Sequence, residues 1–242
     1  KLLMIDLSSE SIEILPVSND LKKDFIGGKG FGAKLLYDMV LPDTDPLGKD
    51  NVLMFMTGPL TGTMAPAMRG CVVTKSPLTG IFLDSYFGGS FAPEIKYAGY
   101  DGLIIKGQAK KPVFIWINDD TVEIRDARHL WGTDTLAANE RIKTELKDET
   151  IKIASIGQAG ENQVLFALVC CEYNRQAGRG GAGAVMGSKN LKAIAIKGSK
   201  LVSIHDPKRF TKACATAFKE LETSQDVEAF RVAGTAASVD FA

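Results

Sequence analysis

The sequence predicts an α+β fold that contains an internally duplicated unit. Short apolar runs of strand length are interspersed with helical patterns along the 242 residues. Two segments also repeat one order of strand, polar turn, glycine loop, helix and strand. The first glycine loop covers residues 85–91 and the second covers residues 177–190. We therefore predict two related halves, each of which presents one glycine loop.

Length, composition and charge restrict the class of protein. The length suits one large domain, or one domain with part of a second. A formal net charge of zero argues against a general nucleic-acid binder. No apolar run approaches the ~20 residues that a membrane-spanning helix needs, and no signal-peptide pattern opens the chain. We expect a cytoplasmic protein that binds neither nucleic acid nor membrane.

The cysteines and histidines form no pattern that predicts a metal site. No two cysteines have CxxC spacing, and we expect reduced, mostly buried thiols. Neither histidine has a partner at metal-ligand spacing, so each is interpreted as a surface or helix-capping residue. The residues concerned are Cys71, Cys170, Cys171, Cys214, His129 and His205.

Alternating and continuous apolar runs predict the elements of the first half. A hairpin is expected over residues 1–7 and 11–16, followed by a helix over 19–25 that Asn19 would cap and a helix over 33–39. Further strands are expected over residues 51–57, 70–74, 81–83 and 102–106, with a helix over 92–98.

The second half is predicted in the same way. A hairpin turns at Asp119-Asp120. A helix capped by Thr133 would then place Leu136, Ile142 and Leu146 on one stripe. Strands are expected over residues 113–118, 121–125, 151–156, 165–171 and 191–196, and Asp206-Pro207 would open a helix over 207–221.

A cluster of glycines over residues 27–32 allows two interpretations. No parallel-sheet strand precedes it, and it lacks the acidic residue that a dinucleotide site requires, which makes a Rossmann site a weak match. The cluster is either a turn between two helices or a segment that approaches a large cofactor closely.

The loop over residues 177–190 is the strongest candidate site. Glycine packs nothing and loses the most backbone entropy on folding, so a dense cluster needs a reason. The usual reason is that backbone N–H groups approach phosphate, and the alternative is a tight connection without a ligand. Around Arg179 stand Gly178, Gly180, Gly181, Gly183 and Gly187.

The two loops share more than glycine. Gly88-Gly89 and Gly180-Gly181 each open a helix, and each helix leads to a strand that ends in Ile-Lys-Gly. Duplication could place both loops around one elongated ligand or two similar ones. Arginines flank the loops, and their planar forks match phosphate, although each alone could be a solvated surface residue. They are Arg69, Arg175 and Arg179.

Five motifs stand in order along the chain between about Leu3 and His205. They are Gly58-Pro-Leu-Thr-Gly-Thr63, Thr74-Lys-Ser-Pro-Leu-Thr-Gly80, Glu94-Ile-Lys-Tyr-Ala-Gly-Tyr-Asp101, Ala154-Ser-Ile-Gly157 with Ala159-Gly-Glu-Asn162, and the loop over residues 177–190. Together they resemble the N-terminal domain of the tungsten-containing aldehyde ferredoxin oxidoreductase family.

The resemblance implies a fold and a cofactor. The fold would be two β-sheets with flanking helices, internally duplicated, forming the base for a bis-pterin cofactor. Tungsten would be held by the sulfurs of two molybdopterins (tungstopterin), whose phosphates share Mg2+. A [4Fe–4S] cluster is expected in such an enzyme, but this chain would not ligate it.

The same resemblance assigns residues by motif. Arg69 would lie between the pterin and the iron–sulfur cluster. The backbone carbonyls of Tyr86 and Gln176 would bind magnesium; neither side chain is the one expected there, which a backbone ligand tolerates. No catalytic residue is expected. The pterin and its phosphates would be contacted by Gly88, Gly89, Arg175, Gln176, Gly178, Arg179, Gly180, Gly181 and Gly183.

The implied activity is oxidation of an aldehyde to a carboxylic acid, with ferredoxin as electron acceptor. Residues 1–205 would be the tungstopterin-binding N-terminal domain, and residues 206–242 the start of a truncated helical second domain. Partners would be ferredoxin, the aldehyde and the remaining domains of the same polypeptide, with a homo-oligomer left open. The alternatives are a tungsten-dependent acyl-CoA (aromatic ring) reductase subunit and a stand-alone pterin-binding module.

Overall fold

The computed structural model describes residues 1–236, which divide into two compact units. The first unit comprises residues 1–63 and 67–202 and contains both β-sheets of the described chain. The second comprises residues 64–66 and the chain from Ser203 onward. It holds helices α7 (Pro207–Glu222) and α8 (Gln225–Ala233). No helix of the described residues is long and apolar enough to cross a bilayer.

The first sheet contains the six strands of the first half of the chain. Its order is β2-β1-β6-β3-β4-β5, and β1 and β6 are parallel while the other neighbours are antiparallel. The strands are β1 (Leu2–Asp6), β2 (Ser11–Leu15), β3 (Leu53–Thr57), β4 (Gly70–Lys75), β5 (Phe82–Phe87) and β6 (Gly102–Lys106).

The second sheet repeats this arrangement strand for strand. Its order is β8-β7-β12-β9-β10-β11 when read from the hairpin end, and again only β7 and β12 are parallel. The duplication predicted from the glycine loops is therefore confirmed, and it extends over all twelve strands. They are β7 (Val113–Asn118), β8 (Thr121–Asp126), β9 (Lys152–Ser155), β10 (Val169–Cys171), β11 (Arg175–Ala177) and β12 (Leu191–Lys197).

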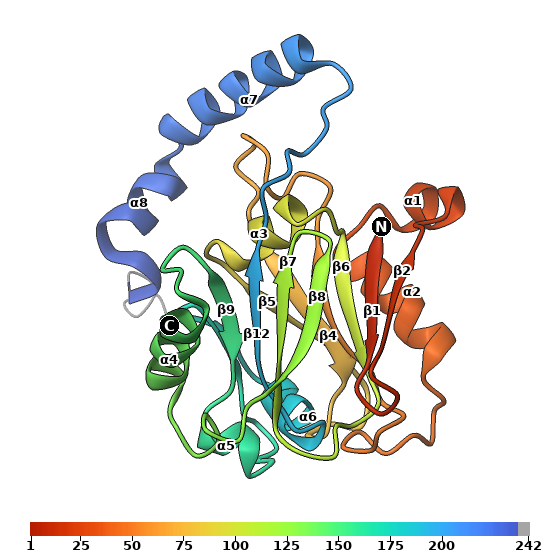
Figure 1. Cartoon of the computed structure of the whole chain (residues 1–242). Helices are drawn as coiled ribbons and strands as arrows, with labels where there is room; N and C mark the ends of the chain where they lie inside the picture. The colour runs from red at the N-terminus through yellow and green to blue at the C-terminus, as the bar shows by residue number, and fades with distance from the viewer. Residues whose placement is uncertain (237–242) are drawn as a thin grey trace. The chain divides into compact units, whose positions relative to one another are not determined.

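The helices also occur in matched pairs. Helices α2 (Lys29–Met39) and α4 (Thr135–Leu146) cover the outer faces of the first and second sheet (Figure 1). Helices α3 (Phe91–Tyr97) and α6 (Ala182–Ser188) each contact strands of both sheets. The short helices α1 (Asn19–Phe25) and α5 (Gln158–Glu161) have no counterpart.

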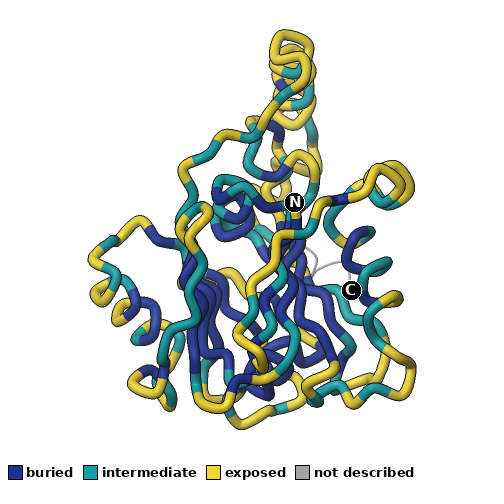
Figure 2. Tube along the Cα trace, turned by 45° about the vertical axis from the view of Figure 1, so that its right-hand side comes forward, coloured by how far each residue is buried: buried dark blue, intermediate teal, exposed yellow. Residues whose placement is uncertain are grey.

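The structure has three hydrophobic clusters: an inner one that draws residues from both sheets, and two outer ones under helices α2 and α4. Successive residues of a strand belong alternately to the inner cluster and to an outer one. In β6, Leu103 and Ile105 join the inner cluster, and Ile104 faces the helix α2 side. In β12, Ile194 and Ile196 face inward, and Ala193 and Ala195 face the α4 side. Because side chains of a strand alternate between its faces, this pattern requires both faces to be covered. Figure 2 shows the central strands of both sheets coloured mostly as buried residues.

Several predicted boundaries were wrong. The caps are Ser18 and Asp134, whose side chains accept from Leu21 N–H and Ala137 N–H, and not Asn19 and Thr133. Leu136 is 53% exposed because it lies on the opposite side of α4 from the buried Ala138 and Ile142. The strand expected over residues 165–171 is reduced to three residues, β5 runs on to Phe87, and β11 and α5 were missed.

Gly30 and Gly32 of the glycine cluster allow helix α2 to pack closely against its neighbours. Helix α2 begins at Lys29, so Gly30 and Gly32 lie inside it. An added Cβ at Gly32 would lie 2.6 Å from Val73 Cγ2, and one at Gly30 would collide with the carbonyl oxygen of Phe25. At Gly30 and Gly32 the close approach is thus to the protein's own backbone and core.

Candidate functional site

The two glycine loops lie at the junction between the halves, where edge strands β5 and β11 are in contact. Ser85 Oγ donates a hydrogen bond to the carbonyl of Gly178 over 2.7 Å. Ser76 Oγ donates to the carbonyl of Gly180 over 2.6 Å. The second loop is therefore held by two serines of the first half.

The first loop has rigid ends. Phe87 and Phe91 bracket residues 88–90, and both are buried. They pack edge-to-face on each other and on Phe55, with centroid distances of 5.8–6.3 Å. Aromatic pairs of this geometry contribute about 0.5–1.5 kcal/mol each beyond burial. The backbone of the loop is thus presented on a fixed aromatic base.

Three predicted site glycines are required by the fold itself. An added Cβ at Gly180 would collide with Leu83, and Gly180 has a left-handed φ of 58°. Added Cβ atoms at Gly181 and Gly183 would collide with the carbonyls of Leu165 and Leu168. Side chains at these three positions would displace α6 from its buried seat, so they need no ligand to explain them.

Gly88 and Gly178 are different. An added Cβ at Gly178 would meet nothing within 4 Å, and one at Gly88 would meet only Arg175 Cδ, at 3.8 Å. Neither residue has a positive φ. Since neither packing nor backbone conformation requires glycine there, the space above both residues is open for a ligand that approaches the backbone.

The predicted arginines have free guanidinium groups. Arg69, Arg175 and Arg179 are exposed, and within residues 1–236 their side chains make no hydrogen bond or ion pair. The other three arginines of the first unit bind Glu123, Asp126 and the His129 carbonyl. A guanidinium presents five donors in a planar fork, so the three free ones suit an anion with several oxygens.

Tyr86 and Gln176 occupy the same position in the two halves. Each is the penultimate residue of its edge strand, Tyr86 in β5 and Gln176 in β11. Each pairs with a buried cysteine of the next strand, Cys71 in one half and Cys170 in the other. The duplication therefore places Tyr86 and Gln176 at equivalent points of the two edge strands.

The buried cysteines do not supply thiolates. Burial raises the pKa of Cys71 to about 12, and burial also raises the pKa of Cys170. All four cysteines are buried and unbridged. No group of three or more metal-ligating side chains gathers among the described residues. The site's own chemistry is thus that of backbone amides, open glycines and guanidinium groups.

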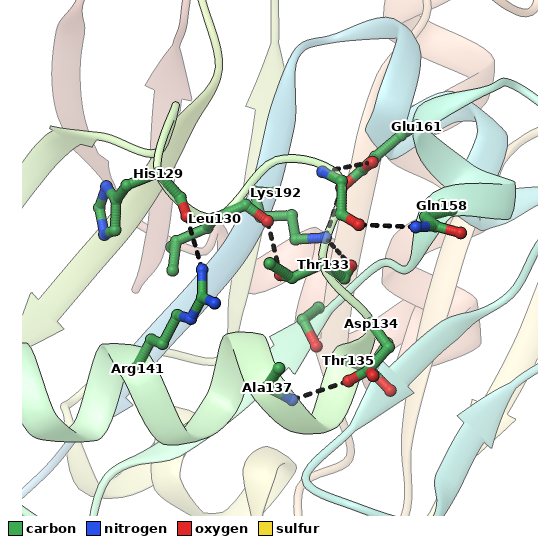
Figure 3. A network of polar contacts seen from close by, with 12 residues as sticks. His129, Leu130, Thr133, Asp134, Thr135, Ala137, Arg141, Gln158, Glu161 and Lys192 are labelled. Carbon is green, nitrogen blue, oxygen red and sulfur yellow. Dashed lines mark hydrogen bonds and ion pairs between the residues drawn. The ribbon is translucent and has the colours of Figure 1, made fainter.

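A buried ion pair fixes the chain beyond the second loop. Lys192 of β12 binds the Glu161 carboxylate and donates to the Thr133 carbonyl over 2.8 Å (Figure 3). Glu161 also accepts the N–H of Gly132 over 2.8 Å, and Gln158 Nε2 donates to the carbonyl of Gly132. Both charges are almost fully buried. This network ties α5 and the turn before α4 to the second sheet.

Sequence reasoning missed the residues that hold the loops from the opposite half. Ser76 lay within one of the five motifs but was given no role of its own. Ser85 was placed in a loop and lies in β5. Glu172, whose carboxylate accepts the N–H of Ser90 over 2.6 Å, gave no local signal because the contact spans 82 residues.

The chain is thus a duplicated two-sheet α+β protein whose halves meet at two open glycines flanked by three arginines that are unpaired within the described residues. The model of the aldehyde ferredoxin oxidoreductase N-terminal domain matches residues 2–198. The chain belongs to this family.

Characterised relatives extend the comparison. The tungsten-containing aldehyde ferredoxin oxidoreductase of Pyrococcus furiosus is 47% identical over 211 residues, which are 87% of this chain and 35% of that protein. The aliphatic sulfonate oxidoreductase, WOR-like subunit, of Pyrococcus furiosus is 39% identical over 98% of this chain and 40% of its own length. The chain thus spans little more than a third of these relatives.

One solved structure has nearly the same fold. The active-site complex BamBC of benzoyl coenzyme A reductase, in complex with 1,5-dienoyl-CoA, superposes with a TM-score of 0.90 at 39% identity. The match covers 93% of this chain and 34% of that one. The predicted two-sheet architecture with flanking helices and internal duplication is confirmed.

Proposed function

We propose that this chain is the tungstopterin-binding part of a tungsten oxidoreductase that oxidises aldehydes to carboxylic acids and passes the electrons to ferredoxin. The observation that carries the proposal is the pair of open glycines, Gly88 and Gly178, beside three free guanidinium groups at the junction of the halves. Phosphates of a bis-pterin cofactor fit this set. The names of the relatives support tungsten and the aldehyde substrate.

The residues have separate roles in this proposal. Gly88 and Gly178 leave room for the cofactor, and Arg175 and Arg179 bind its phosphates. Arg69 lies beside the pterin, toward the iron–sulfur cluster of the complete enzyme. The remaining predicted contacts are Gly89, Gln176, Gly180, Gly181 and Gly183, of which the last three also serve packing of α6.

Magnesium completes the proposed binding site. The carbonyls of Tyr86 and Gln176, equivalent in the two halves, are its proposed protein ligands. Carbonyl oxygen is a hard ligand of the kind that Mg2+ takes together with phosphate oxygens. Tyr86 and Gln176 do not carry the side chains that the family resemblance leads one to expect, but a ligand from the backbone does not depend on the side chain.

The bound tungstopterin would supply two-electron redox chemistry. This chain's residues bind and orient the cofactor, and we assign no catalytic side chain to it. We propose residues 1–205 as the cofactor-binding domain and residues 206–242 as the start of a helical second domain. The aldehyde, ferredoxin, a [4Fe–4S] cluster held elsewhere and the remaining domains complete a cytoplasmic enzyme, with a homo-oligomer left open.

The solved benzoyl coenzyme A reductase complex favours a second candidate. Its 39% identity and TM-score of 0.90 make a tungsten-dependent acyl-CoA (aromatic ring) reductase the main alternative. Both candidates use the same cofactor site, so they differ in the substrate and not in the roles of the residues above.

The experiment is metal, pterin and activity analysis of the complete gene product, grown with tungstate. We expect tungsten and molybdopterin, with aldehyde oxidation coupled to ferredoxin reduction. Reaction with an aromatic acyl-CoA instead of aldehydes would favour the reductase. Cofactor without either activity would favour a stand-alone binding module. An active, intact protein without tungsten or pterin would refute the proposal.

A further inference from the structure

Glu172 links the two halves at the first glycine loop. It lies in the turn between β10 and β11 of the second half and has a left-handed φ of 59°. Its Oε2 accepts the N–H of Ser90, in the first half, over 2.6 Å. A non-glycine residue in this conformation is strained and persists where its surroundings hold it. The contact with Ser90 is one of those restraints.

The contact between Glu172 and Ser90 passes directly over Gly89. An added Cβ at Gly89 would collide with Glu172 Oε2 and lie 3.0 Å from Arg175 Cγ. The Glu172 carboxylate and the stem of Arg175 therefore both lie over Gly89. Arg175 belongs to the second half, and its Cδ lies 3.8 Å from the position of an added Cβ at Gly88, so its stem crosses to the loop of the first half.

The two side chains do not form an ion pair with each other. Glu172 Oε2 is bonded to Ser90, and Oε1 lies 3.9 Å from Lys152 Nζ. Within the described chain, Arg175 has no carboxylate partner. Glu172 thus lies near the stem of Arg175 without forming an ion pair with it.

The glycine loop of the second half is held by an equivalent but uncharged hydrogen bond. Ser76 follows β4 as Glu172 follows β10, and Ser76 donates to the Gly180 carbonyl over 2.6 Å. Each turn therefore reaches the glycine loop of the other half. Only the Glu172 contact carries a charge, and a charge-assisted hydrogen bond is roughly twice as strong as a neutral one.

We propose that Glu172 is a positioning residue for the cofactor site. It fixes the loop over residues 88–90 and holds Arg175 across the junction, so that the guanidinium of one half serves the phosphate bound at the other. This inference rests on the proposed function. It concerns how tightly a phosphate-bearing cofactor is held, and assigns Glu172 no part in the redox step.

The test measures release of molybdopterin from the complete, tungstate-grown protein. The variants are Glu172→Ala, Glu172→Gln, Arg175→Met and the double variant Glu172→Ala/Arg175→Met. Glu149→Ala is the matched control, because Glu149 is 84% exposed and its one ion pair, with Lys143, is 4.0 Å long. Circular dichroism at the same temperature verifies that each variant is folded.

We expect Glu172→Ala to release the pterin about tenfold faster than wild type, as loss of a hydrogen bond to a charged group implies. Glu172→Gln, which keeps an acceptor, restores part of the retention. The double variant releases faster than Arg175→Met alone but by less than the product of the two single effects, because Glu172 acts partly through Arg175 and partly through the N–H of Ser90.

Two results would overturn the inference while leaving the proposed function intact. One is wild-type release from folded Glu172→Ala. The other is a double variant whose effect is the product of the single effects. Wild-type protein without pterin would instead refute the proposed function and this inference together.

Discussion

Ser85 of the first half donates a hydrogen bond to the carbonyl of Gly178 in the second, over 2.7 Å. Ser85 is buried, whereas an added Cβ at Gly178 would have no neighbour within 4 Å. A residue of one sheet therefore fixes the backbone of the ligand-facing loop on the other. The loop's position depends on how the halves pack, and not only on its own sequence.

Removing this hydrogen bond should affect both the fold and cofactor binding. We expect Ser85→Ala to lower the free energy of unfolding by about 1 kcal/mol, the net value of such a bond. The cofactor content of the complete protein should fall as well, because the Gly178 carbonyl is no longer held. Urea denaturation and tungsten analysis check the two effects. Unchanged values for both would show that the contact has no role.

Substitution by alanine should affect the stability of the fold differently at Gly178 and Gly180. Gly178→Ala places its Cβ in open space and should leave the free energy of unfolding within about 0.5 kcal/mol of wild type, while reducing cofactor content. Gly180→Ala collides with Leu83 and strains a left-handed φ of 58°, so it should destabilise the fold by about 1–3 kcal/mol. Equal destabilisation by both variants would contradict the distinction between open and packed glycines.

The Lys192–Glu161 pair should be sensitive to loss of one partner. Lys192→Met leaves a buried carboxylate without its cation and should cost about 3–5 kcal/mol in the free energy of unfolding. Lys192→Met combined with Glu161→Gln should recover part of that loss, because the amide can still accept the N–H of Gly132. Urea denaturation of both variants is the measurement. A double variant less stable than Lys192→Met would contradict the reasoning.

Lys189 should give the first unit an unusual pH dependence. It is fully buried, its Nζ donates to the carbonyls of Asn51 over 2.6 Å and Gly107 over 3.0 Å, and burial lowers its pKa to about 8. The unfolded chain, with a pKa near 10.5, then binds the proton more tightly than the folded one. The charged, buried Lys189 therefore lowers the free energy of unfolding, and this penalty is full below pH 8. As the pH rises from 8 toward 10.5, the free energy of unfolding should increase by about 3 kcal/mol.

The control is Lys189→Met, which removes the titrating group. Stability of the wild type relative to this variant should rise between pH 8 and 10, whatever the variant's absolute stability. Chemical denaturation at several pH values provides the comparison. A flat difference across that range would show that Lys189 does not titrate with a lowered pKa.

Much of the fold could be predicted from the sequence because its signals are local. Strand alternation and apolar runs located eleven of the twelve strands, β11 being the exception. β11 was missed because Arg175-Gln176-Ala177 has no apolar pattern and is a strand only through its pairing with β10. The caps of α1 and α4 were each displaced by one residue, since serine, asparagine, threonine and aspartate all suit that position, whereas the start of α7 at Asp206-Pro207 was correct.

The candidate site was predicted less completely, for a physical reason. Glycine density and flanking arginines located both loops, because these residue types are unusual wherever they occur. Sequence alone could not separate Gly178 from Gly180, since the difference lies in Leu83, nearly a hundred residues away. It also gave no sign of Glu172, whose contact with Ser90 exists only when the halves are packed.

The central claim is that the loops around Gly88 and Gly178 together hold one tungstopterin assembly. A crystal structure of the tungstate-grown complete protein, with anomalous scattering recorded at the tungsten edge, tests it most directly. The account predicts a tungsten peak above the junction of the two halves, with pterin phosphates bonded to residues of both loops. A tungsten site remote from both loops, or phosphates bound without contact to either, would contradict it.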